Sequence, residues 1–154
     1  MSLIKRKDIS SVAQKLRRQK KKIVFTNGVF DILHRGHVDY LKKAKSFGDI
    51  LIVGLNSDSS VRKIKGPNRP INKQTDRAYI LLALEAVDYV VIFSEETPKR
   101  LIEQIKPNVL VKGADYKISE IVGADFVKAN GGSVRRVRLS KGRSTTGIIK
   151  ALNK

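Results

Sequence analysis

Residues 23–49 read IVFTNGVFDILHRGHVDYLKKAKSFGD, and this stretch decides the fold. It opens with the apolar run 23–25, breaks at a turn that contains Gly28, and then passes into a helical pattern. The only two histidines among 154 residues, His34 and His37, stand three positions apart where that helix begins. Side chains at this spacing share a helix face, and a helix N-terminus favours phosphate because its free N–H groups carry partial positive charge. The stretch therefore predicts chemistry on a phosphate group.

The rest of the chain alternates short apolar runs with helical patterns. Strands are expected over 23–26, 49–55, 89–93, 109–111 and 134–139, and helices over 38–46, 75–86, 97–105, 119–129 and 144–152. Several strands are continuous runs of Val, Ile and Leu, which is typical of strands buried on both faces. The pattern predicts a single-domain α/β fold: a Rossmann-like, doubly wound parallel sheet of five strands. Ligands of such sheets bind beyond the carboxyl ends of the strands.

The net charge of +18 is the strongest signal in the composition. It predicts an anionic partner, such as a nucleotide, a phosphorylated metabolite, nucleic acid or an acidic membrane surface. A solvated, lysine-rich surface would explain the lysines but not the shortage of acidic residues. The charge is dense in residues 1–22, which we separate as a basic N-terminal helical segment from a domain over residues 23–154.

Several classes of protein are excluded by what the sequence lacks. No run is long and apolar enough to span a membrane, and no apolar stretch follows the basic N-terminus as in a signal peptide. The chain has no cysteine, so disulfides and thiolate metal sites are excluded. A structural zinc site needs three or four ligands, and the lack of a third histidine disfavours it. We therefore expect a cytoplasmic protein without a membrane partner. The histidines could still be capping or core residues.

Polar residues follow the predicted strands and should meet at one edge of the sheet. They are Asn27, Gly28, Asp31, His34 and His37 after the first strand, Asn56 and Asp58 after the second, Lys112, Gly113, Asp115 and Tyr116 after the fourth, and Arg143, Ser144, Thr145 and Thr146 after the fifth. Glycine allows close approach to a phosphate, and hydroxyls at a helix start suit an anion. Each feature alone has an ordinary alternative as a turn or an N-cap, so the site rests on their convergence.

Residues 26–49 closely resemble the opening of the HxGH nucleotidyltransferase superfamily, and residues 143–149 resemble its second signature. Within its cytidylyltransferase-like branch, residues 51–58, 65–72, 77–88 and 110–116 resemble the family of D-glycero-β-D-manno-heptose 1-phosphate adenylyltransferases. The resemblance covers nearly everything from residue 23 to the end. Two departures are mild: Val29 replaces a cysteine that is common in the family, and Ala114 replaces a glycine.

The resemblance implies transfer of AMP from ATP to the heptose 1-phosphate, giving ADP-heptose and pyrophosphate for the lipopolysaccharide core. It implies His34, His37 and Lys65 as catalytic residues, and Asp58, Arg77 and Tyr116 as sugar-phosphate ligands. The nucleotide would contact Asn27, Gly28, Val29, Phe30, Asp31, Gly36, Lys112, Gly113, Asp115, Arg143, Ser144, Thr145 and Thr146. Mg²⁺ would bridge the phosphates, through Asp31 or another carboxylate. Relatives of this fold are often dimers, so a homodimer is expected by analogy. In the family the domain is often fused behind a sugar kinase; no kinase is present in this sequence, so we expect a stand-alone form and a separate sugar kinase.

Two other functions stay open on sequence alone. One is a cytidylyltransferase for glycerol 3-phosphate or a similar alcohol phosphate, although residues 139–142 depart from the arginine-rich ending of those enzymes. The other is a nucleic-acid-binding domain that uses the basic residues 1–22. That alternative leaves the histidine pair unexplained, and the segment has no aromatic residue before Phe25 on which a base could stack. We therefore expect no nucleic-acid partner.

Overall fold

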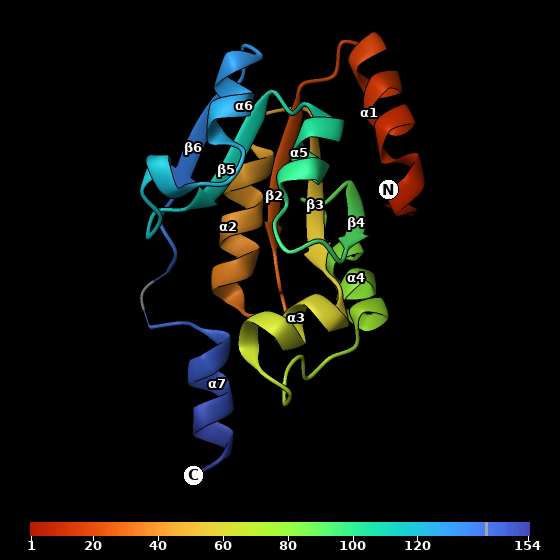
Figure 1. The fold of residues 1–154 in the computed structure, drawn as a ribbon. Helices are drawn as coiled ribbons and strands as arrows, with labels where there is room; N and C mark the ends of the chain where they lie inside the picture. Colours follow the sequence, from red (N-terminus) through yellow and green to blue (C-terminus); the bar gives the residue numbers. More distant parts are fainter. Residues whose placement is uncertain (141) are drawn as a thin grey trace.

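The apolar runs of the sequence form one parallel sheet with helices on both faces (Figure 1). The computed structural model describes residues 1–140 and 142–154. Within them six strands lie in the order β1-β4-β3-β2-β5-β6: β1 (Ser2–Ile4), β2 (Ile23–Gly28), β3 (Ile50–Asn56), β4 (Tyr89–Phe93), β5 (Val109–Gly113) and β6 (Ser133–Val137). The α-helices are α1 (Ile9–Arg18), α2 (Arg35–Lys45), α3 (Asp58–Lys65), α4 (Gln74–Leu82), α5 (Lys99–Ile105), α6 (Ala124–Ala129) and α7 (Thr145–Leu152). Two 3-10 turns, η1 (Arg6–Asp8) and η2 (Ile118–Glu120), complete the fold. The predicted parallel α/β sheet is confirmed.

The sheet has one strand more than the five that the sequence predicts. The missed strand, β1, lies in the basic N-terminal segment and pairs in parallel with β4. Its three residues are too few for the alternation that reveals a strand, and a partner far along the chain stabilises it. Three apolar residues of this segment, Ile4 of β1 and Ile9 and Leu16 of α1, are buried in the same apolar core as Phe25. The N-terminal segment is therefore packed against the sheet, and a domain boundary at residue 22 stays a prediction.

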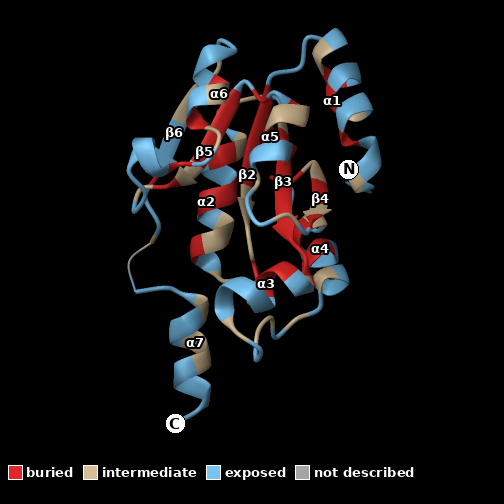
Figure 2. Ribbon diagram, viewed as in Figure 1, coloured by how far each residue is buried: buried red, intermediate tan, exposed pale blue. Residues whose placement is uncertain are grey.

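The sheet separates two apolar cores. Phe25 of β2 packs with residues of α1, α5 and α6 on one face, and Val24 packs with residues of α2 and α4 on the other. This alternation follows from the two-residue period of a strand. In Figure 2 the buried residues follow β3 and β5 through the middle of the molecule. The polar ends of the strands are thereby held between two rigid layers.

The helices also differ from the sequence prediction in their extent. The helix α3 lies where the sequence predicts only a loop. A short and polar helix gives little periodic signal, which is why the pattern does not reveal it. Ser57 marks its start: its Oγ accepts a hydrogen bond from the N–H of Ser60 at 3.2 Å. The helix α4 ends at Leu82 instead of continuing to residue 86. Among the described residues, no helix is long and apolar enough to cross a membrane.

Candidate active site

A cavity of about 660 Å³ opens where β2, β3 and β5 end, at the carboxyl edge of the sheet. Parallel α/β sheets bind their ligands at this edge. All the residues predicted for catalysis and nucleotide binding line the cavity, together with Tyr116: His34, His37, Lys65, Asn27, Gly28, Val29, Phe30, Asp31, Gly36, Lys112, Gly113, Asp115, Arg143, Ser144, Thr145 and Thr146. Two predicted sugar-phosphate ligands, Asp58 and Arg77, are not among the lining residues.

The histidine pair forms the first turn of α2. His34 is the N-cap residue, and its Nδ1 accepts a hydrogen bond from the N–H of Gly36 at 3.1 Å. Nδ1 of His37 accepts from the main-chain N–H of His34 at 3.3 Å. The two ring centroids are 3.9 Å apart, so the prediction that both imidazoles share one face is confirmed. A Cβ at Gly36 would come within 2.9 Å of the His34 ring, which explains the glycine between them.

These hydrogen bonds determine which ring nitrogen carries the proton. Because Nδ1 of each imidazole accepts a hydrogen bond, each neutral ring carries its proton on Nε2. Burial, with a smaller contribution from the neighbouring His34, lowers the pKa of His37 to about 4. Burial also lowers the pKa of His34, with a contribution from the charge of Arg143. At neutral pH the site therefore offers two neutral Nε2–H donors.

The turn between β2 and α2 is held in a strained conformation. Phe30 has a φ of 47°, a region that residues other than glycine seldom adopt. Its buried ring packs on His37, with the centroids 5.4 Å apart. Arg77 holds the main chain of the turn: its Nη1 donates to the carbonyl oxygen of Val29 at 2.7 Å. Such strain persists only where the surroundings over-determine it, so packing positions this turn against the cavity.

Arg77 is a structural residue rather than a ligand-binding one. Its side chain is 0% exposed, and Nη2 donates to Oδ1 of Asp58 at 2.8 Å. The other guanidinium donors reach the carbonyl oxygens of Val29, Asn56 and Asn72. The family resemblance implies that Arg77 and Asp58 contact the sugar phosphate, but the Arg77 side chain is fully buried and neither residue lines the cavity. A buried arginine cannot be told from a phosphate-binding one by its position in the sequence.

Asp31 lines the cavity, but its carboxylate is occupied. Its oxygens accept from Nε of Arg69 at 2.8 Å and from the N–H groups of Ile71 and Asn72 at 2.9 Å. Burial acts to raise the pKa of Asp31, but these hydrogen bonds and the Arg69 charge outweigh it and hold the pKa below its ordinary value. The carboxylate joins the β2–α2 turn to the loop before α4. Because its oxygens already accept hydrogen bonds from Arg69, Ile71 and Asn72, the carboxylate of Asp31 is not placed to bind magnesium. In the described part of the chain, no three His, Cys, Asp or Glu side chains gather as metal ligands.

The N-terminus of α7 forms the part of the cavity wall that lies beside the histidines. Ser144 is its N-cap, and its Oγ accepts from the N–H of Gly147 at 3.0 Å. The hydroxyl of Thr145 donates to the carbonyl oxygen of Ile32 at 3.1 Å, which docks α7 on the β2–α2 turn. Arg143 and Thr146 line the cavity at the same place. Free N–H groups, hydroxyls and a cation thus gather next to the histidine pair, an arrangement that suits a polyphosphate.

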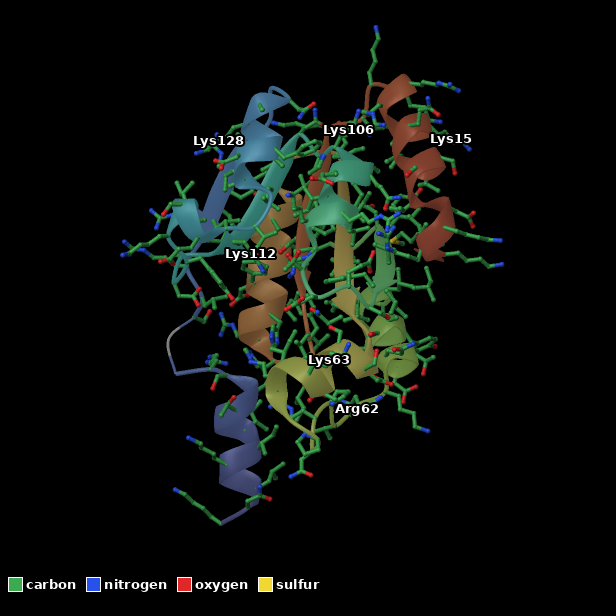
Figure 3. All side chains as sticks on the ribbon, viewed as in Figure 1. Lys15, Arg62, Lys63, Lys106, Lys112 and Lys128 are labelled. Atoms are coloured by element: carbon green, nitrogen blue, oxygen red, sulfur yellow. The ribbon has the colours of Figure 1, made fainter. Side chains whose placement is uncertain are left out.

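Lys112, labelled in Figure 3, lines the cavity from the end of β5. Its Nζ lies 3.4 Å from the main-chain oxygen of Asn27 and 5.1 Å from the ring centroid of Tyr116. Burial lowers the pKa of Lys112, and the carboxylate of Asp115 acts in the opposite direction. A Cβ at Gly113 would come within 2.4 Å of Oδ1 of Asp115, so only glycine allows this carboxylate its place.

Sequence reasoning missed a group of residues that also line the cavity: Tyr40, Ile64, Arg69, Glu96, Thr97, Pro98, Glu120, Ile121, Val122 and Leu139. Glu96, Thr97 and Pro98 follow the end of β4, so the rule that ligands bind beyond strand ends could have found them. The others have no local signal, because only tertiary packing brings them to the site.

A parallel α/β sheet that places a histidine pair and a helix N-terminus around one cavity defines a phosphate-binding domain of the nucleotidyltransferase type. The comparison with protein families agrees with this class: a profile described as cytidylyltransferase-like matches residues 25–148. The chain belongs to the cytidylyltransferase-like family.

Curated relatives share high identity with this chain. It is 56% identical over 145 residues to the bifunctional protein HldE of Nitratiruptor sp., covering 94% of this chain and 30% of that protein. It is 62% identical over 133 residues to the bifunctional protein HldE of Campylobacter concisus, covering 86% and 27%. The chain thus spans less than a third of the length of these relatives.

Solved structures support the same fold. A lipopolysaccharide core biosynthesis protein from Thermoplasma volcanium has a TM-score of 0.63 and 32% identity, covering 80% of this chain and 99% of that chain. A pantoate-beta-alanine ligase from Francisella tularensis has a TM-score of 0.66 and 22% identity, covering 99% and 77%. The second likeness concerns the fold alone.

Proposed function

We propose that this chain transfers AMP from ATP to D-glycero-β-D-manno-heptose 1-phosphate, releasing pyrophosphate and forming ADP-heptose for the lipopolysaccharide core. The single observation that carries the proposal is the meeting of His34, His37 and the N-terminus of α7 at one cavity. Family membership, the resemblance of several motifs to heptose 1-phosphate adenylyltransferases and the identity with HldE proteins support the choice of substrate. The likeness to a lipopolysaccharide core biosynthesis protein points the same way.

The reaction needs no strong general base. The attacking atom is an oxygen of the sugar phosphate, which is already ionised near neutral pH because its second pKa is about 6. That oxygen forms a bond to the α-phosphorus of ATP, and the bond from this phosphorus to the bridging oxygen breaks, so that pyrophosphate leaves. Catalysis then depends on positioning the groups in line and on stabilising the charge that develops. The site provides donors for both purposes.

Each element of the cavity has one role in this proposal. The neutral Nε2–H groups of His34 and His37 donate to the triphosphate as charge develops on it. The N-terminus of α7, with Thr145 and Thr146, holds the β- and γ-phosphates. The strained β2–α2 turn presents its main chain to the nucleotide, and Lys65 meets the phosphate of the incoming sugar from the side of α3.

The protein offers no cage for magnesium in this proposal. Asp31 was the candidate ligand, and its carboxylate oxygens already accept from Arg69, Ile71 and Asn72. Mg²⁺ therefore enters only as the counter-ion that ATP carries, and no step here passes through it. A cytoplasmic location, a homodimer and a sugar kinase that supplies the sugar phosphate belong to the same proposal.

A pyrophosphate-release assay tests the function directly. ATP and CTP are each combined with the heptose 1-phosphate and with glycerol 3-phosphate. Release is expected only from ATP with the heptose 1-phosphate. Release from CTP with glycerol 3-phosphate would instead support the cytidylyltransferase alternative, and no release from any pair would refute nucleotidyl transfer to these acceptors.

A further inference from the structure

One polar atom of the cavity wall is buried without a partner. Oδ1 of Asn27 has no hydrogen-bond partner within residues 1–140 and 142–154. Buried polar groups are almost always paired, so a buried amide oxygen that is left unpaired beside a cavity calls for a ligand. The amide offers two N–H donors and an acceptor oxygen, which suits hydroxyl groups that both donate and accept.

The position of Asn27 in β2 determines which side of the cavity its amide serves. Asn27 and Phe25 are two residues apart on the strand, so their side chains share a sheet face. The place that a Cβ of Gly54 would take lies 3.2 Å from Cβ of Asn27 and 2.8 Å from Cζ of Phe25, which puts both side chains on the same face. Phe25 packs in the core beneath α5 and α6, so Asn27 lies on this face as well. The absence of a side chain at Gly54 lets the Phe25 ring pack against β3 beside Asn27.

The groups that bind phosphate in the proposed function approach from the other face. The histidines stand on α2, which covers the face opposite Phe25, and Thr145 docks α7 onto the turn that leads into α2. In a direct displacement the attacking and leaving oxygens lie in line on opposite sides of the phosphorus. The pyrophosphate departs toward α7, so the acceptor must come from the opposite side, where Asn27 lies.

The charges of this side are mixed and include carboxylates. Lys112 lies two residues after Leu110, which shares the core of Phe25, so it stands on this side as well, with its Nζ 3.4 Å from the main-chain oxygen of Asn27. Glu96, just after β4, and Glu120, at the end of η2, both line the cavity. Carboxylates accept hydrogen bonds from hydroxyls and repel phosphate, whereas Arg143 and the α7 N-terminus stand beside the histidines. The cavity thus has a side with the histidines and the α7 N-terminus, and a side where an amide, two carboxylates and the ammonium of Lys112 offer both acceptors and donors to hydroxyl groups.

We propose that Asn27 is a specificity-determining residue that binds hydroxyl groups of a polyhydroxylated acceptor, rather than a contact to the nucleotide as its motif suggested. This inference rests on the proposed function, which supplies a sugar phosphate as acceptor. The amide of Asn27 and the carboxylates of Glu96 and Glu120 together form the sugar side of the cavity.

The experiment compares three variants of the full chain: Asn27→Ala, Asn27→Leu and the control Asn130→Ala. Asn130 is exposed at the end of α6, where its amide donates to Phe126. We expect both Asn27 variants to raise the KM of the heptose 1-phosphate about 3- to 10-fold, the range for loss of one neutral hydrogen bond. The KM of ATP should stay within about twofold in all variants.

Two further readouts separate recognition from structure. Neither Asn27 variant should lower the melting temperature, because each removes an amide oxygen that is buried without a partner, and leucine preserves the shape of the side chain. Propyl phosphate carries a phosphate but no hydroxyl, so its inhibition constant should not change in the Asn27 variants. An equal loss for the sugar phosphate and for propyl phosphate would overturn the proposal, as would a raised KM for ATP alone or a lowered melting temperature. A wild-type chain that turns over no sugar phosphate would instead refute the proposed function, and the sugar-binding role with it.

Discussion

Replacing Arg77 by methionine should destabilise the fold. The guanidinium is fully buried and donates to four acceptors on three segments of the chain. Three are the carbonyl oxygens of Val29, Asn56 and Asn72, at 2.7, 2.9 and 3.0 Å, and the fourth is Oδ1 of Asp58 at 2.8 Å. Methionine fills much of the same space but donates no hydrogen bond, so all four acceptors lose their partner.

The size of the effect follows from the burial of this ion pair. Removing one partner of a buried ion pair costs about 3–5 kcal/mol, out of a total stability of about 5–15 kcal/mol. The side chain of Asp58 is 25% exposed, so water relieves part of the cost and favours the lower end. One kcal/mol lowers the Tm of a domain of this size by about 2–4 °C. The Tm of Arg77→Met should therefore fall by about 6–20 °C.

Thermal unfolding followed by circular dichroism measures this fall. The matched control is Arg62→Met, because Arg62 is exposed on α3 (Figure 3) and its Tm should stay within about 2 °C of the wild type. Arg77→Lys should also lose stability, because an ammonium group cannot reproduce the planar fork of donors. A variant Arg77→Met with the wild-type Tm and a raised KM for the sugar phosphate would refute this reasoning. That result would restore the substrate contact that the sequence predicts.

Four other outcomes are expected. Replacing His37 by alanine should lower kcat about 100-fold or more and change the Kd of ATP less, because the lost donor acts mainly as charge develops; normal turnover would contradict its role. The pKa of His37 is lowered to about 4 from an ordinary 6.5, so the unfolded chain binds more protons between these values. Lowering the pH through this range should therefore reduce the free energy of unfolding, and urea titrations should show a smaller reduction in His37→Gln. Replacing Thr146 by alanine should weaken ATP binding more than sugar-phosphate binding in calorimetric titrations, and an unchanged Kd for ATP would count against the α7 phosphate site. Replacing Arg6 by alanine should lower the Tm by about 2–4 °C, because Arg6 pairs with Glu95 just before the cavity wall; a scanning calorimeter detects such a shift.

The parts of the site that could be predicted from the sequence are local ones. The histidine pair and its glycine depend on helix geometry within a few residues, and the structure places them as expected. The same holds for Ser144, whose hydroxyl caps α7 where the pattern predicts a helix start. Strand ends converge because parallel strands share an edge, so residues distant in sequence could be grouped correctly.

The parts that could not be predicted depend on partners far along the chain. The carboxylate of Asp31 looks like a metal ligand in sequence, but Arg69, Ile71 and Asn72 occupy it. Likewise β1 exists because β4 offers it an edge, and three residues give no periodic signal of their own. In both cases a contact with residues far along the chain decides the outcome, and neither composition nor local spacing predicts such a contact.

The net charge of the chain indicates an anionic partner, but it does not explain how the cavity would bind phosphate. Its lining carries four basic and four acidic residues: Lys65, Arg69, Lys112 and Arg143, and Asp31, Glu96, Asp115 and Glu120. Lys15, Lys106 and Lys128 lie toward the end of the molecule away from α7 in Figure 3, and salt screens exposed charges beyond about 8 Å. Phosphate recognition here must therefore come from oriented donors at short range: two neutral imidazoles, a helix N-terminus and a few placed cations. The capping bonds of His34 and His37 connect this chemistry to the fold, because the hydrogen bonds that begin α2 also set each Nε2–H toward donation.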